Sequence, residues 1–279
     1  MTDQYPLFFY KYFPNKDWAL DGLSNSYSTF SSRKGLNDLF DSKIDIINPT
    51  PNELKLLRDS FKKQQQKQKY KIIDEWFNKG KMTDQGEEVL KIVNSTFNKT
   101  IDSFIFLCVS KLNNSSLMWS HYANAHEGFC IEFKSTQISA RKVEYKKDIA
   151  TINSNIYIPL FLNRCHGIKM EKQEEENVGK SIIDSLLIKI NKCEYEQEYR
   201  YHLAHKVKKE PLKDTCGEII KGKYKVKYTS DFIESVIFGC RTSDKFKDKI
   251  KEIIKDKMPT VKIKQAYEMK SSIGIRLSK

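Results

Sequence analysis

The most constraining feature of the chain is an almost wholly apolar run at residues 103–110, SFIFLCVS. A run of this length and composition is typical of a strand buried on both faces. Residues 128–133 (GFCIEF) follow with strict alternation, which places Phe129, Ile131 and Phe133 on one side of a second strand. The two segments together predict a sheet with a buried central strand.

The rest of the chain alternates between strand-like and helix-like patterns. Further strands are expected at residues 7–13, 27–32, 195–203, 232–238 and 261–266, and helices at residues 17–23, 87–97, toward the end of 169–190, and at 246–257. Helical patterns dominate residues 51–100, and no linker rich in Pro, Gly or Ser separates them from the rest. We therefore expect one α+β domain over residues 1–279, with a mixed, split central β-sheet flanked by helices and a helical insertion at residues 51–100.

Composition indicates a globular chain without a membrane span. The sequence of 279 residues is 39% hydrophobic and contains 14 Tyr and 16 Phe, which supply bulky core side chains. No window approaches the roughly 18 uncharged apolar residues that a spanning helix needs. The first residues read as a strand interrupted by Lys11, and not as a secretion signal. We expect a cytoplasmic protein that does not bind membranes.

Cysteine spacing argues against a metal site. No two of the six cysteines form a C-x-x-C pair, whereas zinc sites and small disulfide scaffolds usually show tighter spacing. We expect reduced, structural thiols and no bound metal. The residues are Cys108, Cys130, Cys165, Cys193, Cys216 and Cys240.

The net charge is +13, from 49 Lys and Arg against 36 Asp and Glu. Such a surplus attracts polyanions through their phosphates without reading their sequence, which makes nucleic acid an expected partner. A solvated lysine coat, as in proteins from AT-rich bacterial genomes, explains the same composition. The sequence leaves both open.

The segment 193–202, CEYEQEYRYH, carries a row of charges. In a strand, Glu194, Glu196, Glu198 and Arg200 would share one face while the tyrosines faced the core. Burying several carboxylates on one face is costly, because like charges raise one another's pKa. Such a face is therefore expected in a cleft, where it has a function. The alternative is a helix with an exposed Glu196–Arg200 pair at i, i+4 spacing.

Residues 117–133, LMWSHYANAHEGFCIEF, place His121 and Tyr122 just before a sheet. An imidazole and a phenol there could donate to a phosphate or stack on a base or nicotinamide ring. His121 and His126 are five apart, which is not the zinc-helix spacing. The alternative is that Trp119 and Tyr122 pack in the core and that His121 bonds to a backbone carbonyl.

Residues 36–41, LNDLFD, follow the strand expected at 27–32. Asn37 could cap a short helix whose first turn contains Asp38. On such a helix Asp38 and Asp41 would share a face and could hold Mg²⁺ through water, although capping alone explains the pattern.

Together these segments resemble the bacterial family called domain of unknown function 2971. The likeness rests on Y-K-Y near the start, N-D-x-F-D, M-W-x-H-Y-x-x-x-H-x-G-F-C-I-E-F, a lysine followed by E-x-E-Y-R, and I-x-x-V-I-F-G-C-R. In this chain the motifs are residues 10–12, 37–41, 118–133, Lys189 with Glu196, Glu198 and Arg200, and residues 233–241. This likeness implies little about function.

At the level of fold, the opening strands and the later Glu-x-Glu are also similar to ADP-ribosyltransferases, which bind NAD in a cleft of a split sheet. That similarity implies Glu198 as the catalytic carboxylate, Glu196 as its helper and NAD as substrate. His121 is a further candidate for catalysis. The residues expected to hold the dinucleotide are Lys11, Tyr12, Ser31, Ser32, Asn37, Asp38, Asp41, Trp119, Tyr122, Lys189 and Arg200.

Three functions follow as hypotheses. The first is an NAD-consuming, ADP-ribosyltransferase-like toxin or anti-phage defence effector that modifies nucleic acid, with a protein partner encoded in the same operon. The second is a metal-dependent nuclease in which Asp38, Asp41, Glu196 and Glu198 collect Mg²⁺ near Lys189. The third is a non-catalytic module that binds a nucleotide or nucleic acid.

Overall fold

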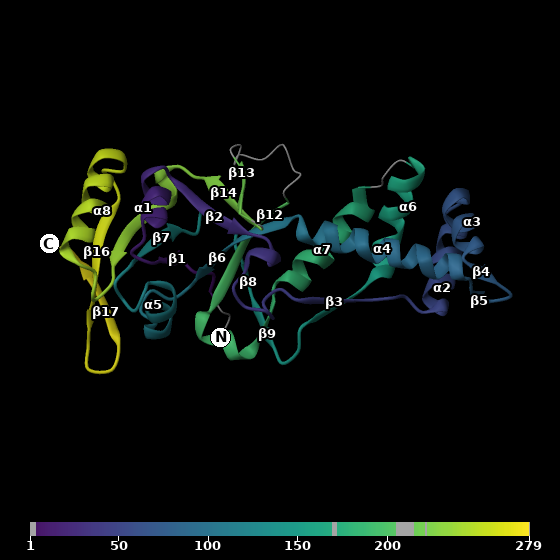
Figure 1. Ribbon diagram of the computed structural model, residues 1–279, viewed down its shortest axis with the longest axis horizontal. Coiled ribbons are helices and arrows are strands. Elements are labelled where there is room, and N and C mark those ends of the chain that lie inside the picture. Colours follow the sequence, from purple (N-terminus) through teal and green to yellow (C-terminus); the bar gives the residue numbers. More distant parts are fainter. Residues whose placement is uncertain (1–3, 169–171, 205–214, 221, 279) are drawn as a thin grey trace. The chain divides into compact units, whose positions relative to one another are not determined.

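Figure 1 shows the computed structural model, which describes residues 4–168, 172–204, 215–220 and 222–278. The contacts divide the chain into two compact units, which we call the sheet unit (residues 1–37, 104–147 and 190–279) and the helical unit (residues 38–103 and 148–189). The structure contains both helices and strands, and its large sheet is mixed, which confirms the predicted α+β class. Among the helices of the described residues, none combines the length and the hydropathy that a membrane crossing requires.

The sheet unit contains one large sheet. Its strands run in the order β13-β14-β2-β6-β1-β7-β15-β16-β17, and β12 pairs with β6 and β8. The elements of the unit are β1 (Phe8–Phe13), α1 (Asp17–Ser24), β2 (Tyr27–Ser31), η1 (Arg33–Gly35), β6 (Phe104–Ser110), α5 (Ser116–Tyr122), β7 (Phe129–Lys134), β8 (Arg141–Lys142), β9 (Glu144–Lys146), η3 (Asn191–Glu196), β12 (Glu198–Ala204), β13 (Thr215–Ile220), β14 (Lys223–Lys227), η4 (Ser230–Phe232), β15 (Ile233–Phe238), α8 (Asp244–Lys257), β16 (Lys262–Glu268) and β17 (Ile273–Leu277).

The apolar run of the sequence forms the central strand β6, which is buried along almost its whole length. It pairs with β12 from Ser110 to Phe104, but with β1 and β2 through only one residue pair each, Tyr10–Ser110 and Ser31–Phe106. The sheet is therefore split beside β6, as expected from the sequence.

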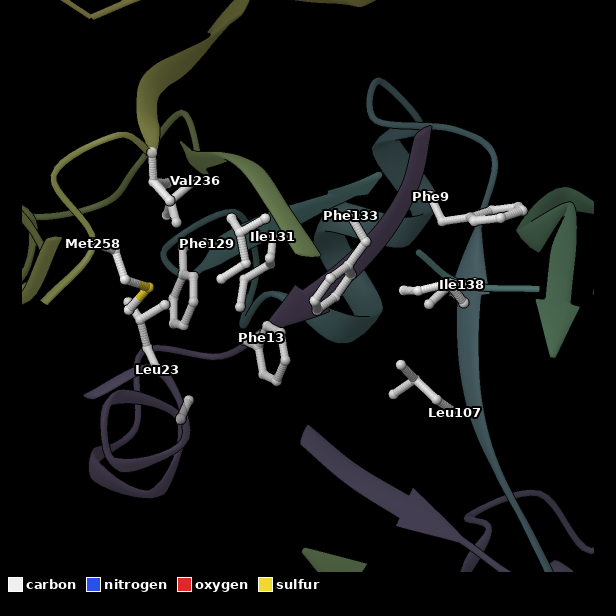
Figure 2. Close-up of a cluster of buried hydrophobic side chains, with 14 of the residues drawn as sticks. Phe9, Phe13, Leu23, Leu107, Phe129, Ile131, Phe133, Ile138, Val236 and Met258 are labelled. Atoms are coloured by element: carbon white, nitrogen blue, oxygen red, sulfur yellow. The ribbon is translucent and has the colours of Figure 1, made fainter. Parts of the chain in front are cut away.

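Alternation along the strands builds the main core on one face of this sheet. Phe9 and Phe13 of β1 meet Phe129, Ile131 and Phe133 of β7, and Figure 2 shows these side chains gathered together. Each buried aromatic or aliphatic side chain contributes about 1.5–3 kcal/mol. Helices α1 and α8 lie side by side over this face and close it (Figure 1). Other members of the cluster include Leu23, Leu107, Ile138, Val236, Ile250, Ile254 and Met258.

The opposite face of the same strands packs a second, smaller core under α5. Tyr10 and Tyr12 of β1 lie there with Cys130 of β7, because they alternate with the residues of the main core. Trp119 of α5 is fully buried against them, and its ring meets the Tyr12 ring edge-on at 5.0 Å.

The helical unit is built mostly from helices. Its elements are β3 (Ile44–Ile47), α2 (Pro51–Lys63), α3 (Lys67–Glu75), β4 (Phe77–Asn78), β5 (Lys81–Met82), α4 (Asp84–Asp102), β10 (Ala150–Asn153), η2 (Ser154–Ile156), α6 (Ile158–His166) and α7 (Lys172–Leu186), and β11 (Ile188–Ile190) spans the boundary. The helices expected at residues 51–100 are present, and β3 pairs in parallel with β10 from the second segment of the unit.

Helix α2 begins with a complete capping box. The Thr50 hydroxyl accepts a hydrogen bond from the Glu53 backbone N–H (3.2 Å), and the Glu53 carboxylate accepts one from the Thr50 N–H (2.6 Å). Both bonds satisfy donors that the helix itself leaves unpaired. Thr50→Ala should therefore lower the free energy of unfolding by about 1 kcal/mol in urea denaturation. Thr50→Ser keeps the hydroxyl and should behave as wild type, and equal loss in both variants would contradict the capping role.

Candidate functional site

A row of polar side chains crosses the face of the sheet that lies opposite the main core. Glu198 of β12 lies directly opposite Ser110, and Ser110 lies opposite Tyr10. Tyr10 in turn lies opposite Glu132, and Glu132 opposite Ser235. Residues that face each other on neighbouring strands point to the same side of a sheet. We call these five buried residues the polar row.

At one end of the row, Glu198 is held by Arg200. The Arg200 Nε donates to Glu198 Oε1 over 2.7 Å, and the guanidinium carbon lies 4.7 Å from the centre of the Phe106 ring. The exposed fractions are 3% for Glu198 and 1% for Arg200. A buried charge is costly unless it is paired, so this pair fixes the carboxylate in one orientation.

The second carboxylate, Glu196, comes from outside the strand. The Tyr122 hydroxyl of α5 donates to Glu196 Oε1 over 2.9 Å, and Ser110 Oγ donates to the Glu196 backbone carbonyl over 2.6 Å. The backbone N–H of Glu198 donates to the Tyr145 hydroxyl over 2.8 Å. Contacts from α5, β6 and β9 thus position the Glu-x-Glu segment within the sheet unit.

The expected single face of alternating acids is not what the structure shows. Residues 191–196 form a 3-10 helix, and the strand begins only at Glu198. Gln197 between them takes a left-handed conformation (φ 45°), which breaks the period of two. Glu194 is exposed as a result, whereas Glu198 and Arg200 do share one face and Tyr199 joins the core.

His121 and Tyr122, which the sequence placed just before a sheet, lie on helix α5. His121 is exposed, and its ring centre lies 6.0 Å from that of Tyr195 in the 3-10 helix beside it. Trp119 donates its indole N–H to the Asn113 carbonyl over 2.8 Å from a fully buried position. This geometry favours a packing role for Trp119 and leaves His121 and Tyr122 as the groups of α5 near the carboxylates.

The residues expected near the opening strands fall on different faces. Tyr12 lies on the face of the polar row and donates to the Leu112 carbonyl over 2.6 Å, whereas Lys11, next in sequence, points to the other face. Ser31 lies opposite Phe106 and thus on the face of Arg200. Ser32 is buried just after β2, and its N–H donates to the Gly222 carbonyl over 2.7 Å.

The remaining predicted residues divide at the boundary between the units. Asn37 ends the first segment of the sheet unit, whereas Asp38, Asp41 and Lys189 belong to the helical unit. Lys189 forms an ion pair of 3.0 Å with Asp41, and both side chains are buried.

The segment 36–41 itself forms turns instead of the expected helix. The Asp38 carboxylate accepts from the Phe40 N–H over 2.8 Å, a turn bond that competes with helix formation. Within the described residues, no group of three His, Cys, Asp or Glu is placed to hold a metal ion.

Glu132 and Tyr10 were not singled out as site residues from the sequence, yet they belong to a buried polar contact that joins several strands of the sheet unit. Glu132 accepts hydrogen bonds from Tyr10 (3.0 Å), from Lys264 Nζ (2.5 Å) and from Ser235. The alternation of GFCIEF already placed Glu132 opposite the apolar side. Its partners could not be found in the sequence, because they come from three other strands.

Burial controls the protonation of the groups around this contact. Burial, together with the negative charge of Glu132, raises the pKa of the Tyr10 phenol, and burial raises the pKa of the Tyr12 phenol. Both therefore stay protonated and act as donors. Burial also raises the pKa of the Cys130 thiol, which keeps it unreactive. Cys108, Cys130, Cys165, Cys193 and Cys240 are free thiols, and the side chain of Cys216 lies outside the described set.

Comparison with known proteins returned one similarity. A family model described as "Protein of unknown function (DUF2971)" matches residues 118–201, the stretch that contains most of α5, together with β7, Glu196, Glu198 and Arg200. No curated protein and no solved structure matches the chain. Residues 118–201 are thus similar to a family whose description names no activity.

Proposed function

We propose that the protein binds NAD and cleaves its nicotinamide–ribose bond, as ADP-ribosyltransferases do. The observation that carries the proposal is the pair of buried carboxylates, Glu198 at the start of β12 and Glu196 in the 3-10 helix just before it, each held by its own donor. Carboxylates fixed before substrate arrives stabilise developing positive charge without reorganising, which is the largest single effect in many active sites.

The reaction that fits this arrangement is a displacement at the anomeric carbon of the nicotinamide ribose. The bond between that carbon and the nicotinamide nitrogen breaks, and nicotinamide leaves with the electron pair. Glu198 stabilises the oxocarbenium-like charge on the ribose, as a carboxylate does in glycoside hydrolysis. A hydroxyl of water or of an acceptor then forms the new bond, and Glu196 receives its proton.

Other groups of the sheet unit have supporting roles. Arg200 keeps Glu198 in position, and Tyr122 does the same for Glu196. His121 and Tyr195 lie beside this segment and supply rings for the nicotinamide or adenine to stack on. Consumption of NAD would arrest a bacterial cell, which is the action of a toxin or of an anti-phage effector.

Incubation of the purified full-length protein with NAD tests the proposal. We expect free nicotinamide to accumulate as NAD disappears, measured by liquid chromatography, and addition of RNA or DNA to increase the rate if nucleic acid is the acceptor. Intact NAD after prolonged incubation, with and without nucleic acid, would overturn the proposal.

A further inference from the structure

The net positive charge of the chain belongs to one of its two units. The sheet unit contains 32 Lys and Arg and 19 Asp and Glu, a net charge of +13. The helical unit contains 17 of each, a net charge of zero, although it comprises 108 of the 279 residues. A lysine coat that merely reflected composition would be shared by both units. The segregation therefore points to a polyanionic partner of the sheet unit.

The β16–β17 hairpin of that unit presents an aromatic ring. Tyr267 lies directly opposite Gly274, and a Cβ atom on Gly274 would come within 2.4 Å of Cζ of Tyr267. The Tyr267 ring therefore lies directly over Gly274, and the Arg276 guanidinium carbon lies 5.1 Å from the centre of the ring. The exposed fraction of Tyr267 is 36%. A ring held in this way loses little conformational entropy when a base stacks on it.

Other charged side chains lie along the hairpin. Lys270 at its tip and Arg276 of β17 are exposed, and so is Glu268 beside Tyr267. Lys262, at the far end of β16, pairs with Glu234. The hairpin and α8 (both yellow in Figure 1) form the C-terminal part of the sheet unit. Cations beside an aromatic platform are the combination with which proteins bind single-stranded nucleic acid.

We propose that the sheet unit binds single-stranded nucleic acid, with phosphates neutralised by its basic side chains and a base stacked on Tyr267. An anionic membrane is a poorer fit, because membrane-surface helices need a free apolar face. The apolar residues of lysine-rich α8, Ile250 and Ile254, are buried in the main core. The proposal extends the proposed function by naming the class of acceptor. Binding is measured without NAD, so the two can fail separately.

Two charge-reversal variants of the full chain distinguish the effect of where the positive charges lie from the effect of the net charge. One replaces Lys245, Lys249 and Lys270 of the sheet unit by glutamate, and the other replaces Lys63, Lys79 and Lys91 of the helical unit. All six lysines are exposed, and each variant lowers the net charge by 6, from +13 to +7. Fluorescence anisotropy with a labelled single-stranded oligonucleotide, between about 50 and 200 mM KCl, measures affinity and its salt dependence.

We expect the sheet-unit variant to bind at least about tenfold more weakly and with a shallower salt dependence, and the helical-unit variant to stay near wild type. Tyr267→Leu should lose about tenfold in affinity, whereas Tyr267→Phe, which keeps the ring, should lose little. Equal weakening of the two charge variants would overturn the proposal. Binding to phosphatidylserine vesicles without binding to the oligonucleotide would also overturn it.

Discussion

Replacement of Glu198 by glutamine should lower the rate of nicotinamide release at least about 1,000-fold. Glutamine has the shape of glutamate, and its carbonyl oxygen still accepts the hydrogen bond that Arg200 Nε donates over 2.7 Å. In the proposed reaction the carboxylate charge stabilises the ribose cation, and the amide lacks that charge, so we expect the chemical step to be slowed. Single-turnover release of nicotinamide at saturating NAD measures that step.

The matched control is Glu194→Gln, which makes the same chemical change at an exposed position of the neighbouring 3-10 helix and should leave the rate unchanged. Removal of one partner from a buried pair can cost about 3–5 kcal/mol of stability, so thermal unfolding must accompany the kinetics. Tyr122→Phe provides a milder variant. It removes only the hydroxyl that bonds Glu196, and it should slow release about tenfold or more.

A folded Glu198→Gln protein that releases nicotinamide at the wild-type rate would exclude Glu198 from catalysis. If instead the wild type releases no nicotinamide but binds NAD or nucleic acid, the chain is a binding module. Nicotinamide release by the wild type distinguishes the two outcomes.

Replacement of Gly128 by alanine should destabilise the sheet unit by roughly 3 kcal/mol or more. A Cβ atom at residue 128 would lie 2.0 Å from the Phe13 carbonyl oxygen, a backbone atom that cannot rotate away. The Gly128 carbonyl also accepts bonds from the Gly239 N–H (3.0 Å) and from the Thr242 hydroxyl (2.6 Å), so the backbone is held on both sides. The midpoint of urea unfolding, followed by tryptophan fluorescence, measures the loss.

Gly179→Ala is the matched control. Gly179 lies within α7, and a Cβ atom there meets no atom within 4 Å. Alanine is the better helix former by about 1 kcal/mol, so this variant should be slightly more stable than wild type. An unfolding midpoint of Gly128→Ala equal to that of wild type would show that β1 and β7 separate without cost, contrary to the structure.

Local patterns were enough to predict the strands that make the core. The burial of a strand is visible in its sequence pattern, so periodicity located both strands: the apolar run of β6 and the alternation of Phe129, Ile131 and Phe133 in β7. The start of β12 could not be found in this way, because a single left-handed residue, Gln197, decides it. Side-chain periodicity carries no signal for a left-handed backbone conformation at a glutamine.

The candidate site depends on pairings that the sequence does not encode locally. The polar row joins residues from five strands whose order in the sheet differs from their order in the chain. The helical unit likewise combines residues 38–103 with residues 148–189, and the insertion predicted at residues 51–100 lies within the first of these segments. Strand register and long-range contacts, not propensity, determine both features.

The discontinuity of the two units has a consequence for cleavage of the backbone. The chain passes from one unit to the other after residues 37, 103, 147 and 189. A protease cut after residue 103 would leave an N-terminal and a C-terminal fragment that each supply part of the sheet unit and part of the helical unit. Neither fragment can bury its apolar surface alone, so nicked protein should remain one particle until denaturant is added.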